Sequence, residues 1–286
     1  MQRQKDSPIR TITLGHSPDP DDAFMFYALA SGKIQTGELR FEHILQDIQT
    51  LNERATRGEL DVTAISIHAY ASVLDKYALL PSGASMGDGY GPMIVSKTRR
   101  TKDEIAKMRI AVPGLMTSAF LAMRLWLGRE FEHIVVPFDQ IFAAVKRGDA
   151  DAGLIIHEGQ LTYQKEGLEL CVDLGAWWKE DTGGLPLPLG GNAIKKSLGK
   201  PLMSRISPLL TESIRYGLAH RAPAVAHAMA YARNMDTPLA DKFVGMYVND
   251  WTLDYGDKGR EAIRLFLRRG YEAGVIPQPV ELEFVE

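Results

Sequence analysis

The sequence has almost no cysteine. Cys171 is the only one among 286 residues, so no disulfide can form within one chain. The chain therefore falls outside the class of small secreted domains that a disulfide framework holds together, and it fits a reducing compartment. Cys171 lies in the strand-like run LELCVD at residues 168–173, where we expect it to pack in the core rather than to act as a nucleophile.

An excess of one charge and long apolar runs are also lacking. The chain carries 33 basic and 36 acidic residues, for a formal net charge of -3, so a nucleic-acid partner is not expected. No stretch comes near the roughly 20 apolar residues that a membrane span needs. The basic residues near the start are not followed by the apolar segment of a secretory signal. We therefore expect a cytoplasmic protein that binds neither membranes nor nucleic acids.

Motifs for metals and organic cofactors are missing as well. No GxGxxG motif follows a strand and no P-loop is present. His16 and His68 lack metal-ligand spacing, and the acids of DPDD at residues 19–22 are better explained as turn and helix-cap residues than as a calcium loop. The sequence thus predicts no metal site and no cofactor.

The chain does contain a regular alternation of strands and helices. Apolar patterns predict strands at residues 10–15, 39–45 and 62–66 and helices at 23–30, 48–56 and 69–77. Asp21 or Asp22 is expected to cap the helix at 23–30. This βαβα order favours parallel strand pairing. At 286 residues, of which 45% are hydrophobic, the chain is long enough for two α/β lobes.

An internal repeat supports two lobes built on one plan. The letters RGELD at residues 57–61 recur as RGDAD at 147–151, and an apolar run follows each copy. Aligning the copies puts Ser66 opposite Ile156, next to His157. The letters DAF at residues 22–24 likewise match SAF at 118–120. The apolar run after RGDAD reads as a buried strand with His157 at its carboxyl end, which is the end where ligands bind in open α/β sheets.

Two extended segments separate the predicted lobes. The glycine- and serine-rich residues 81–91 and the proline-rich residues 186–194 read as crossings. Between them the second lobe repeats the order with strands at 109–112 and 133–138 and helices at 117–126 and 141–146; a helical tail from residue 202 is expected on the first lobe. We therefore predict lobe one at residues 1–92 and 192–286 and lobe two at 93–191.

Four segments are expected to meet across the cleft between these lobes. They are the turn at Ser17, the strand end at Ser66, the helix start at Thr117 and Ser118, and His157. A helix start with two hydroxyls suits a carboxylate, although one hydroxyl could serve only as the helix cap, and Ser66 could cap the following helix or face the cleft. His157 titrates near neutral pH, so it could act as a base or have only a structural role.

Several motifs together resemble the 1,4-dihydroxy-6-naphthoate synthase family of the futalosine route to menaquinone. They are SPxPxDxF at residues 17–24, IIHEG at 155–159 with TY at 162–163, DLGAWW at 173–178, LPLPLG at 185–190, and YVN at 247–249 with LD at 253–254. The resemblance spans nearly the whole chain. It implies a two-lobed, type II periplasmic-binding-protein-like α/β fold, with mixed sheets flanked by helices and a ligand cleft between the lobes.

The resemblance also implies a function and site residues. The implied reaction is a cofactor-independent lyase reaction that converts cyclic dehypoxanthinyl futalosine, a small anionic carboxylate, to 1,4-dihydroxy-6-naphthoate and dihydroxyacetone. His157 matches the proton acceptor of the family and is expected to be neutral in the resting protein. The implied substrate-binding residues are Ala64, Ile65, Ser66, Thr117 and Ser118, to which the cleft argument adds Ser17.

The first loop departs from the usual family pattern SPCPNDTF, because Asp19, Asp21 and Ala23 stand at three of its positions. Two added acids beside an anionic ligand are unfavourable unless they point away. Two alternatives stay open: a non-catalytic protein that binds small carboxylates, and the related chorismate dehydratase. A monomer and a homodimer are both compatible with the sequence.

Overall fold

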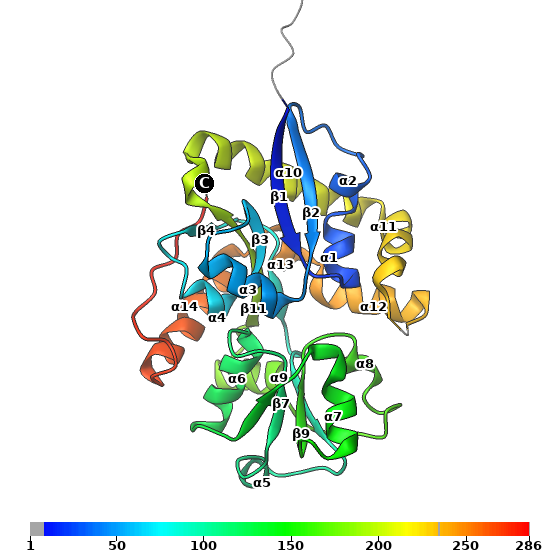
Figure 1. The fold of residues 1–286 in the computed structure, drawn as a ribbon, viewed down its shortest axis with the longest axis vertical. Helices are drawn as coiled ribbons and strands as arrows, with labels where there is room; N and C mark the ends of the chain where they lie inside the picture. The colour runs from blue at the N-terminus through cyan, green and yellow to red at the C-terminus, as the bar shows by residue number, and fades with distance from the viewer. Residues whose placement is uncertain (1–8, 234, 286) are drawn as a thin grey trace, which may run out of the picture.

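The computed structural model describes residues 9–233 and 235–285, which form two sheets with helices packed around them (Figure 1). The first sheet has the strand order β2-β1-β3-β11-β4, with β5 paired to β11. Its parallel pairs are β1 with β2 and β1 with β3, and β11 runs antiparallel to β3, β4 and β5. The strands are β1 (Arg10–His16), β2 (Leu39–Leu45), β3 (Val62–Ser66), β4 (Tyr77–Leu79), β5 (Ser85–Gly87) and β11 (Leu187–Lys195).

The second sheet has five strands in the order β10-β6-β9-β7-β8 and lies below the first in Figure 1. Strand β7 pairs in parallel with β8 and β9, whereas β6 runs antiparallel to β9 and β10. Both sheets are therefore mixed, as expected. The strands are β6 (Met93–Ser96), β7 (Ile110–Val112), β8 (His133–Val135), β9 (Ala152–Ile155) and β10 (Glu169–Asp173).

Helices cover both sheets. Around the first lie α1 (Pro20–Met25), α2 (Tyr27–Ala30), α3 (Ile48–Thr56), α4 (Ile67–Tyr70), α10 (Lys200–Ala219), α11 (Arg221–Ala228), α12 (Thr237–Tyr247), α13 (Asp250–Leu253) and α14 (Gly256–Glu272). Around the second lie α5 (Lys102–Ile105), α6 (Ser118–Leu127), α7 (Ile141–Arg147), α8 (Gly159–Thr162) and α9 (Leu174–Asp181). The short 3-10 helices are η1 (Phe138–Gln140), η2 (Lys196–Leu198) and η3 (Met229–Tyr231). Within the described residues, no helix is both long enough and apolar enough to span a membrane.

The internal repeat has a structural counterpart in each sheet. Val62, which follows the first copy of the motif, pairs with Leu14 of β1, and Ala152, which follows the second copy, pairs with Ile110 of β7. The glycine of each copy has a positive φ, +64° at Gly58 and +85° at Gly148, where a helix ends and the chain turns into a strand. The repeated letters therefore encode the same helix-to-strand turn twice.

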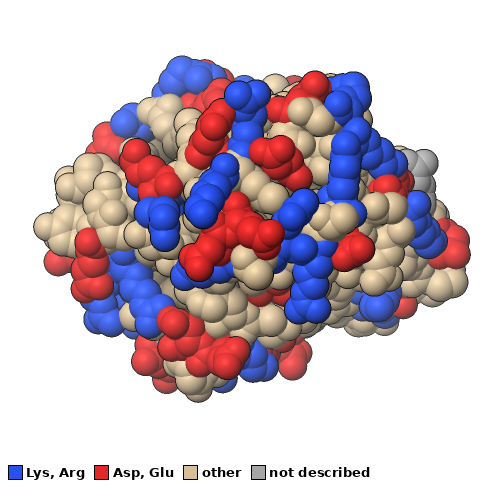
Figure 2. Space-filling model, turned by 90° about the horizontal axis from the view of Figure 1, so that it is seen from below, with Lys and Arg blue, Asp and Glu red and all other residues tan. Residues whose placement is uncertain are grey.

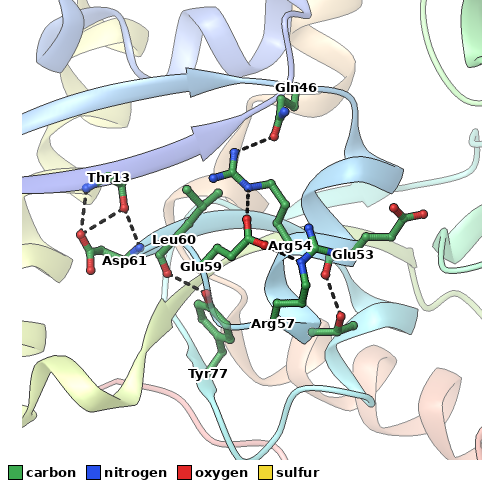
Figure 3. Close-up of polar contacts among 10 residues, drawn as sticks. Thr13, Gln46, Glu53, Arg54, Arg57, Glu59, Leu60, Asp61 and Tyr77 are labelled. Atoms are coloured by element: carbon green, nitrogen blue, oxygen red, sulfur yellow. Dashed lines mark hydrogen bonds and ion pairs between the residues drawn. The ribbon is translucent and has the colours of Figure 1, made fainter.

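The final aspartate of each copy then ties its strand to the neighbouring one. The Asp61 carboxylate accepts hydrogen bonds from the backbone N–H and the hydroxyl of Thr13 (Figure 3). In the second copy, Asp151 accepts one from the Arg109 N–H. The Arg54 guanidinium pairs with Glu59 in the first copy at 2.7 Å (Figure 3). These contacts fix where β3 and β9 begin, and the length of each strand then places Ser66 and His157 at or just after its far end.

One large core cluster joins the two sheets. It includes Ile67 of α4 from the first sheet's helices, Phe120 of α6 and Trp178 of α9 around the second sheet, and Phe266 of α14. The Trp178 and Phe266 rings meet edge to face at a centroid distance of 5.4 Å. The helical tail expected on lobe one thus also contacts, through α14, the helices that cover the second sheet. The boundaries at residues 92 and 192 stay a prediction, and β11 runs through the second of them.

Two helix predictions are wrong in extent. The helix predicted at residues 23–30 begins instead at Pro20, with Asp19 as its N-cap, because proline fits the first turn of a helix; it breaks at Phe26. The helix predicted at 69–77 ends at Tyr70, and Tyr77 begins β4. Burial decides the second case, since Tyr77 is fully buried and its hydroxyl donates to the Leu60 carbonyl oxygen (Figure 3).

The crossing at residues 186–194 is a strand in the interior of the first sheet. Pro188 has no N–H for the ladder, but it lies at a register shift between β11 and β5, where a proline is tolerated. Strands β4 and β5 fall in segments that the sequence did not assign to strands. The face seen from below carries basic and acidic side chains side by side (Figure 2). The absence of a nucleic-acid partner stays a prediction.

Candidate active site

A cleft of about 910 Å³, its solvent-filled mouth included, lies between the two sheets. All seven residues singled out from the sequence line it: Ser17, Ala64, Ile65, Ser66, Thr117, Ser118 and His157. They come from the ends of β1, β3 and β9 and from the start of α6. The structure therefore brings together the four segments that the repeat placed at one cleft.

At the start of α6 the free donors are backbone amides and not hydroxyls. The Thr117 hydroxyl caps the helix: it accepts from the Phe120 N–H at 3.2 Å and donates to the Gly114 carbonyl oxygen. The Ser118 hydroxyl donates to the Leu189 carbonyl oxygen and accepts from the His68 N–H. Within the described residues, the N–H groups of Ser118 and Ala119 have no acceptor. These two amides, at the positive end of a ten-residue helix, suit a carboxylate.

On the opposite side Asn52 orients Ser66. The Asn52 carboxamide accepts from the Ser66 N–H at 2.9 Å and donates to the Ser66 hydroxyl oxygen at 3.0 Å. Ser66 precedes α4 but its side chain makes no cap hydrogen bond to that helix. Of the two roles expected for Ser66, helix cap or cleft-facing residue, the structure shows the second. Because its oxygen accepts from Asn52, the Ser66 hydroxyl keeps its hydrogen for a ligand.

His157 is buried, with contacts at both ring nitrogens. Its Nε2 donates to the Phe138 carbonyl oxygen at 3.0 Å, so Nε2 carries a hydrogen. Its Nδ1 lies 3.1 Å from a carboxylate oxygen of Glu158 and 3.3 Å from the Gly159 nitrogen, whose N–H donates to it. Burial lowers the pKa of His157, but the hydrogen bond and charge of Glu158, together with the Phe138 carbonyl and the charge of Asp19, outweigh burial, and the net shift is upward from 6.5. Neutral His157 in the resting protein stays a prediction.

Arg233 connects the first loop to this histidine. Its guanidinium donates to the Pro18 carbonyl oxygen at 3.0 Å and lies 3.3 Å from Asp19 and 3.7 Å from Glu158. It also lies over the Phe138 ring, 4.7 Å from the centroid. Asp19, one of the three departures from the family loop, therefore has a cationic partner.

The acids of the first loop line the cleft, and their charge is reduced. Burial raises the pKa of Asp19 to about 6 and that of Asp22 to about 7, the latter against the hydrogen bond from the Ser17 N–H. Burial, followed by the charges of Asp22 and Asp19, raises the pKa of Asp21 well above its usual range. The loop thus presents less negative charge to an anionic ligand than its sequence indicates.

Other lining residues were not found from the sequence. Asn192 of β11 is 2% exposed, and its Nδ2 has no hydrogen-bond partner within the described residues. Phe138, Phe243 and Tyr247 add aromatic walls. The only sequence signal for Asn192 was the pair of glycines before it, which leave room beside the strand. Among the described residues, no group of three or more His, Cys, Asp and Glu side chains could hold a metal ion.

Two mixed sheets with a ligand-sized cleft between them define the periplasmic-binding-protein fold. The CA3427 gene product of Candida albicans, described as having the generic form of that fold, superimposes with a TM-score of 0.63 at 12% identity, covering 97% of this chain and 98% of the other. At that identity the likeness shows the fold alone. The profile of the menaquinone biosynthesis family matches residues 12–272, and the chain belongs to this family.

Named relatives place the chain more closely within the family. It is 38% identical to a 1,4-dihydroxy-6-naphthoate synthase of Thermus thermophilus, over 95% of this chain and 98% of the relative. It is 39% identical to the enzyme of that name from Streptomyces coelicolor, over 93% and 95%. Protein AF1704 of Archaeoglobus fulgidus, a solved structure, is 43% identical with a TM-score of 0.89, covering 93% and 98%. The resemblance, the fold class and the enzymatic nature inferred from the sequence are confirmed.

Proposed function

We propose that the protein is a cofactor-independent lyase that converts cyclic dehypoxanthinyl futalosine to 1,4-dihydroxy-6-naphthoate and dihydroxyacetone. The names of two relatives that match over nearly their whole length support this reaction. The observation that carries it is the position of His157 in a cleft lined by groups suited to a small carboxylate. A cytoplasmic location and a monomeric or homodimeric state belong to the same proposal.

In this reaction His157 removes a proton from the bound substrate and so begins the elimination. Because the Phe138 carbonyl keeps a hydrogen on Nε2, the nitrogen that takes the proton is Nδ1. The aromatic walls and the closing of the two sheets on the ligand exclude water from this step.

The substrate carboxylate binds at the amides of Ser118 and Ala119, where the helix dipole favours negative charge. The Ser66 hydroxyl and the Asn192 amide donate to other oxygens of the substrate. An amide donor fixed before the ligand arrives can also stabilise negative charge that develops on a carbonyl oxygen once the proton has left.

The direct test incubates the purified protein with cyclic dehypoxanthinyl futalosine, with chorismate as a parallel substrate. We expect 1,4-dihydroxy-6-naphthoate and dihydroxyacetone in equal amounts from the first and no change in the second. Dehydration of chorismate would identify the related dehydratase. Binding of either compound with no product from either would identify a non-catalytic binding protein.

A further inference from the structure

The family motifs assign no role to Glu158, which is buried, or to Arg233, which is half-buried. Glu158 precedes α8, and its side chain is 10% exposed. Arg233 follows η3 and pairs with Asp19, which lines the cleft. A carboxylate at such depth is costly unless charged partners compensate for the lost hydration, so its retention beside His157 calls for a reason.

The contacts at Nδ1 of His157 differ between its two protonation states. When the ring is neutral, Nδ1 accepts from the Gly159 N–H at 3.3 Å. When Nδ1 gains a proton it can no longer accept, and the carboxylate oxygen of Glu158 at 3.1 Å becomes its acceptor. Meanwhile Nε2 keeps its hydrogen on the Phe138 carbonyl oxygen in both states.

We propose that Glu158 is the positioning residue of His157: its carboxylate accepts a hydrogen bond from Nδ1–H once Nδ1 has taken the proton from the substrate. Arg233 contacts the same carboxylate and weakens that hydrogen bond. The proposal rests on the proposed function for His157 as the base. Arg233 contacts the opposite oxygen of Glu158, at 3.7 Å, and so competes with the imidazolium for one carboxylate. It also pairs with Asp19, the other acid that favours charged His157.

The two residues therefore act on His157 in opposite directions. Removing the charge of Glu158 leaves the protonated ring at most a neutral acceptor, which lowers the pKa of His157. Removing the charge of Arg233 frees both acids to act on the ring, which raises that pKa. The other titratable side chains that line the cleft are Asp21 and Asp22 on α1 and Tyr247 on α12.

The test is a titration of His157 by NMR in ligand-free protein with 13C-labelled histidine rings, in which the His157→Asn spectrum identifies the signal. We compare wild type, Glu158→Gln, Arg233→Met and the double variant. Glu166→Gln and Arg205→Met serve as matched controls, since those residues pair with Lys146 and Glu38 on the surface. Thermal melts confirm that each variant is folded.

We expect Glu158→Gln to lower the pKa of His157, Arg233→Met to raise it, and the controls to leave it unchanged. In the double variant the effect of Arg233→Met shrinks, because one acid through which it acts is gone. The acid limb of the plot of kcat/KM against pH moves with the pKa of His157 in each variant. In Glu158→Gln the plateau value of kcat/KM falls about tenfold to a hundredfold, which is part of what a general base contributes.

An unchanged pKa in Glu158→Gln overturns the proposal, as does a shift in the same direction in both variants. Should Glu158→Gln fail to fold, Glu158→Asp replaces it: the shorter carboxylate lies farther from Nδ1, so the pKa of His157 must still fall. The NMR titration needs no turnover. Failure of wild-type protein to form product would therefore refute the proposed function while leaving the titration result readable.

Discussion

Asn52 holds Ser66 by two hydrogen bonds that leave the serine hydroxyl hydrogen free for the cleft. Asn52 is fully buried on α3, and Ser66 ends β3, so a helix and a strand of the first sheet jointly aim one donor at the ligand. Ser66→Ala removes that donor without removing the backbone contact. We expect KM to rise about tenfold with a small change in kcat, in line with the loss of one hydrogen bond to an uncharged oxygen of the substrate. Steady-state kinetics check this. An unchanged KM would mean that the hydroxyl does not contact substrate.

Asn192→Leu separates a ligand-binding role from a structural one. The Nδ2 of Asn192 is buried without a partner, so a leucine of similar volume removes an unsatisfied group. We expect the melting temperature to stay the same or rise, while kcat/KM falls about tenfold to a hundredfold. Thermal melts and steady-state kinetics measure both. A lower melting temperature with unchanged kinetics would show that Asn192 serves the fold.

Thr117→Ala tests whether the amides or the hydroxyl at the start of α6 bind the carboxylate. Loss of an N-cap costs about 1 kcal/mol, roughly 3 °C in a chain of this size. Since the Thr117 hydroxyl is used within the helix start, we expect KM to change less than threefold. Chemical denaturation and kinetics check the two expectations. A large rise in KM at unchanged stability would assign the hydroxyl to the substrate instead.

Asp22 makes stability depend on pH. Its pKa rises from 3.8 in the unfolded chain to about 7 in the folded protein, so between these values the folded state binds more protons. Stability therefore decreases as pH rises through this window, and it is highest below it. Asp22→Asn keeps an acceptor for the Ser17 N–H but cannot ionise. We expect the variant to match wild type near pH 4 and to be more stable at pH 8, by about 4 kcal/mol. Equal pH dependence in the two proteins would contradict the shifted pKa.

The sequence could predict those parts of the site that depend on local pattern. The repeated RGELD and RGDAD turns set the register of β3 and β9, so Ser66 and His157 could be placed at one cleft without a structure. Predictions failed where distant contacts decide. Residues 77–79 are a strand because the first sheet buries them, and residues 187–195 join the same sheet despite Pro188.

Arg233 and Asn192 were missed for a related reason. Arg233 meets Asp19 across more than two hundred residues of chain, and no local spacing indicates that pairing. Asn192 lies on a strand, and the alternation of polar and apolar residues along a strand is the same whether the polar side chain faces a cleft or solvent. Asp19 could be recognised from the sequence as a departure from the family loop. The cation that compensates its charge, Arg233, could not be recognised.

The central claim is that His157 is the base, and turnover by His157→Asn tests it most directly. Asparagine can still donate to the Phe138 carbonyl oxygen but cannot take up a proton. We expect the rate of 1,4-dihydroxy-6-naphthoate formation to fall by about 10²-fold to 10⁴-fold, while cyclic dehypoxanthinyl futalosine still raises the melting temperature of the variant as it does for wild type. A variant that turns over at the wild-type rate would contradict the claim.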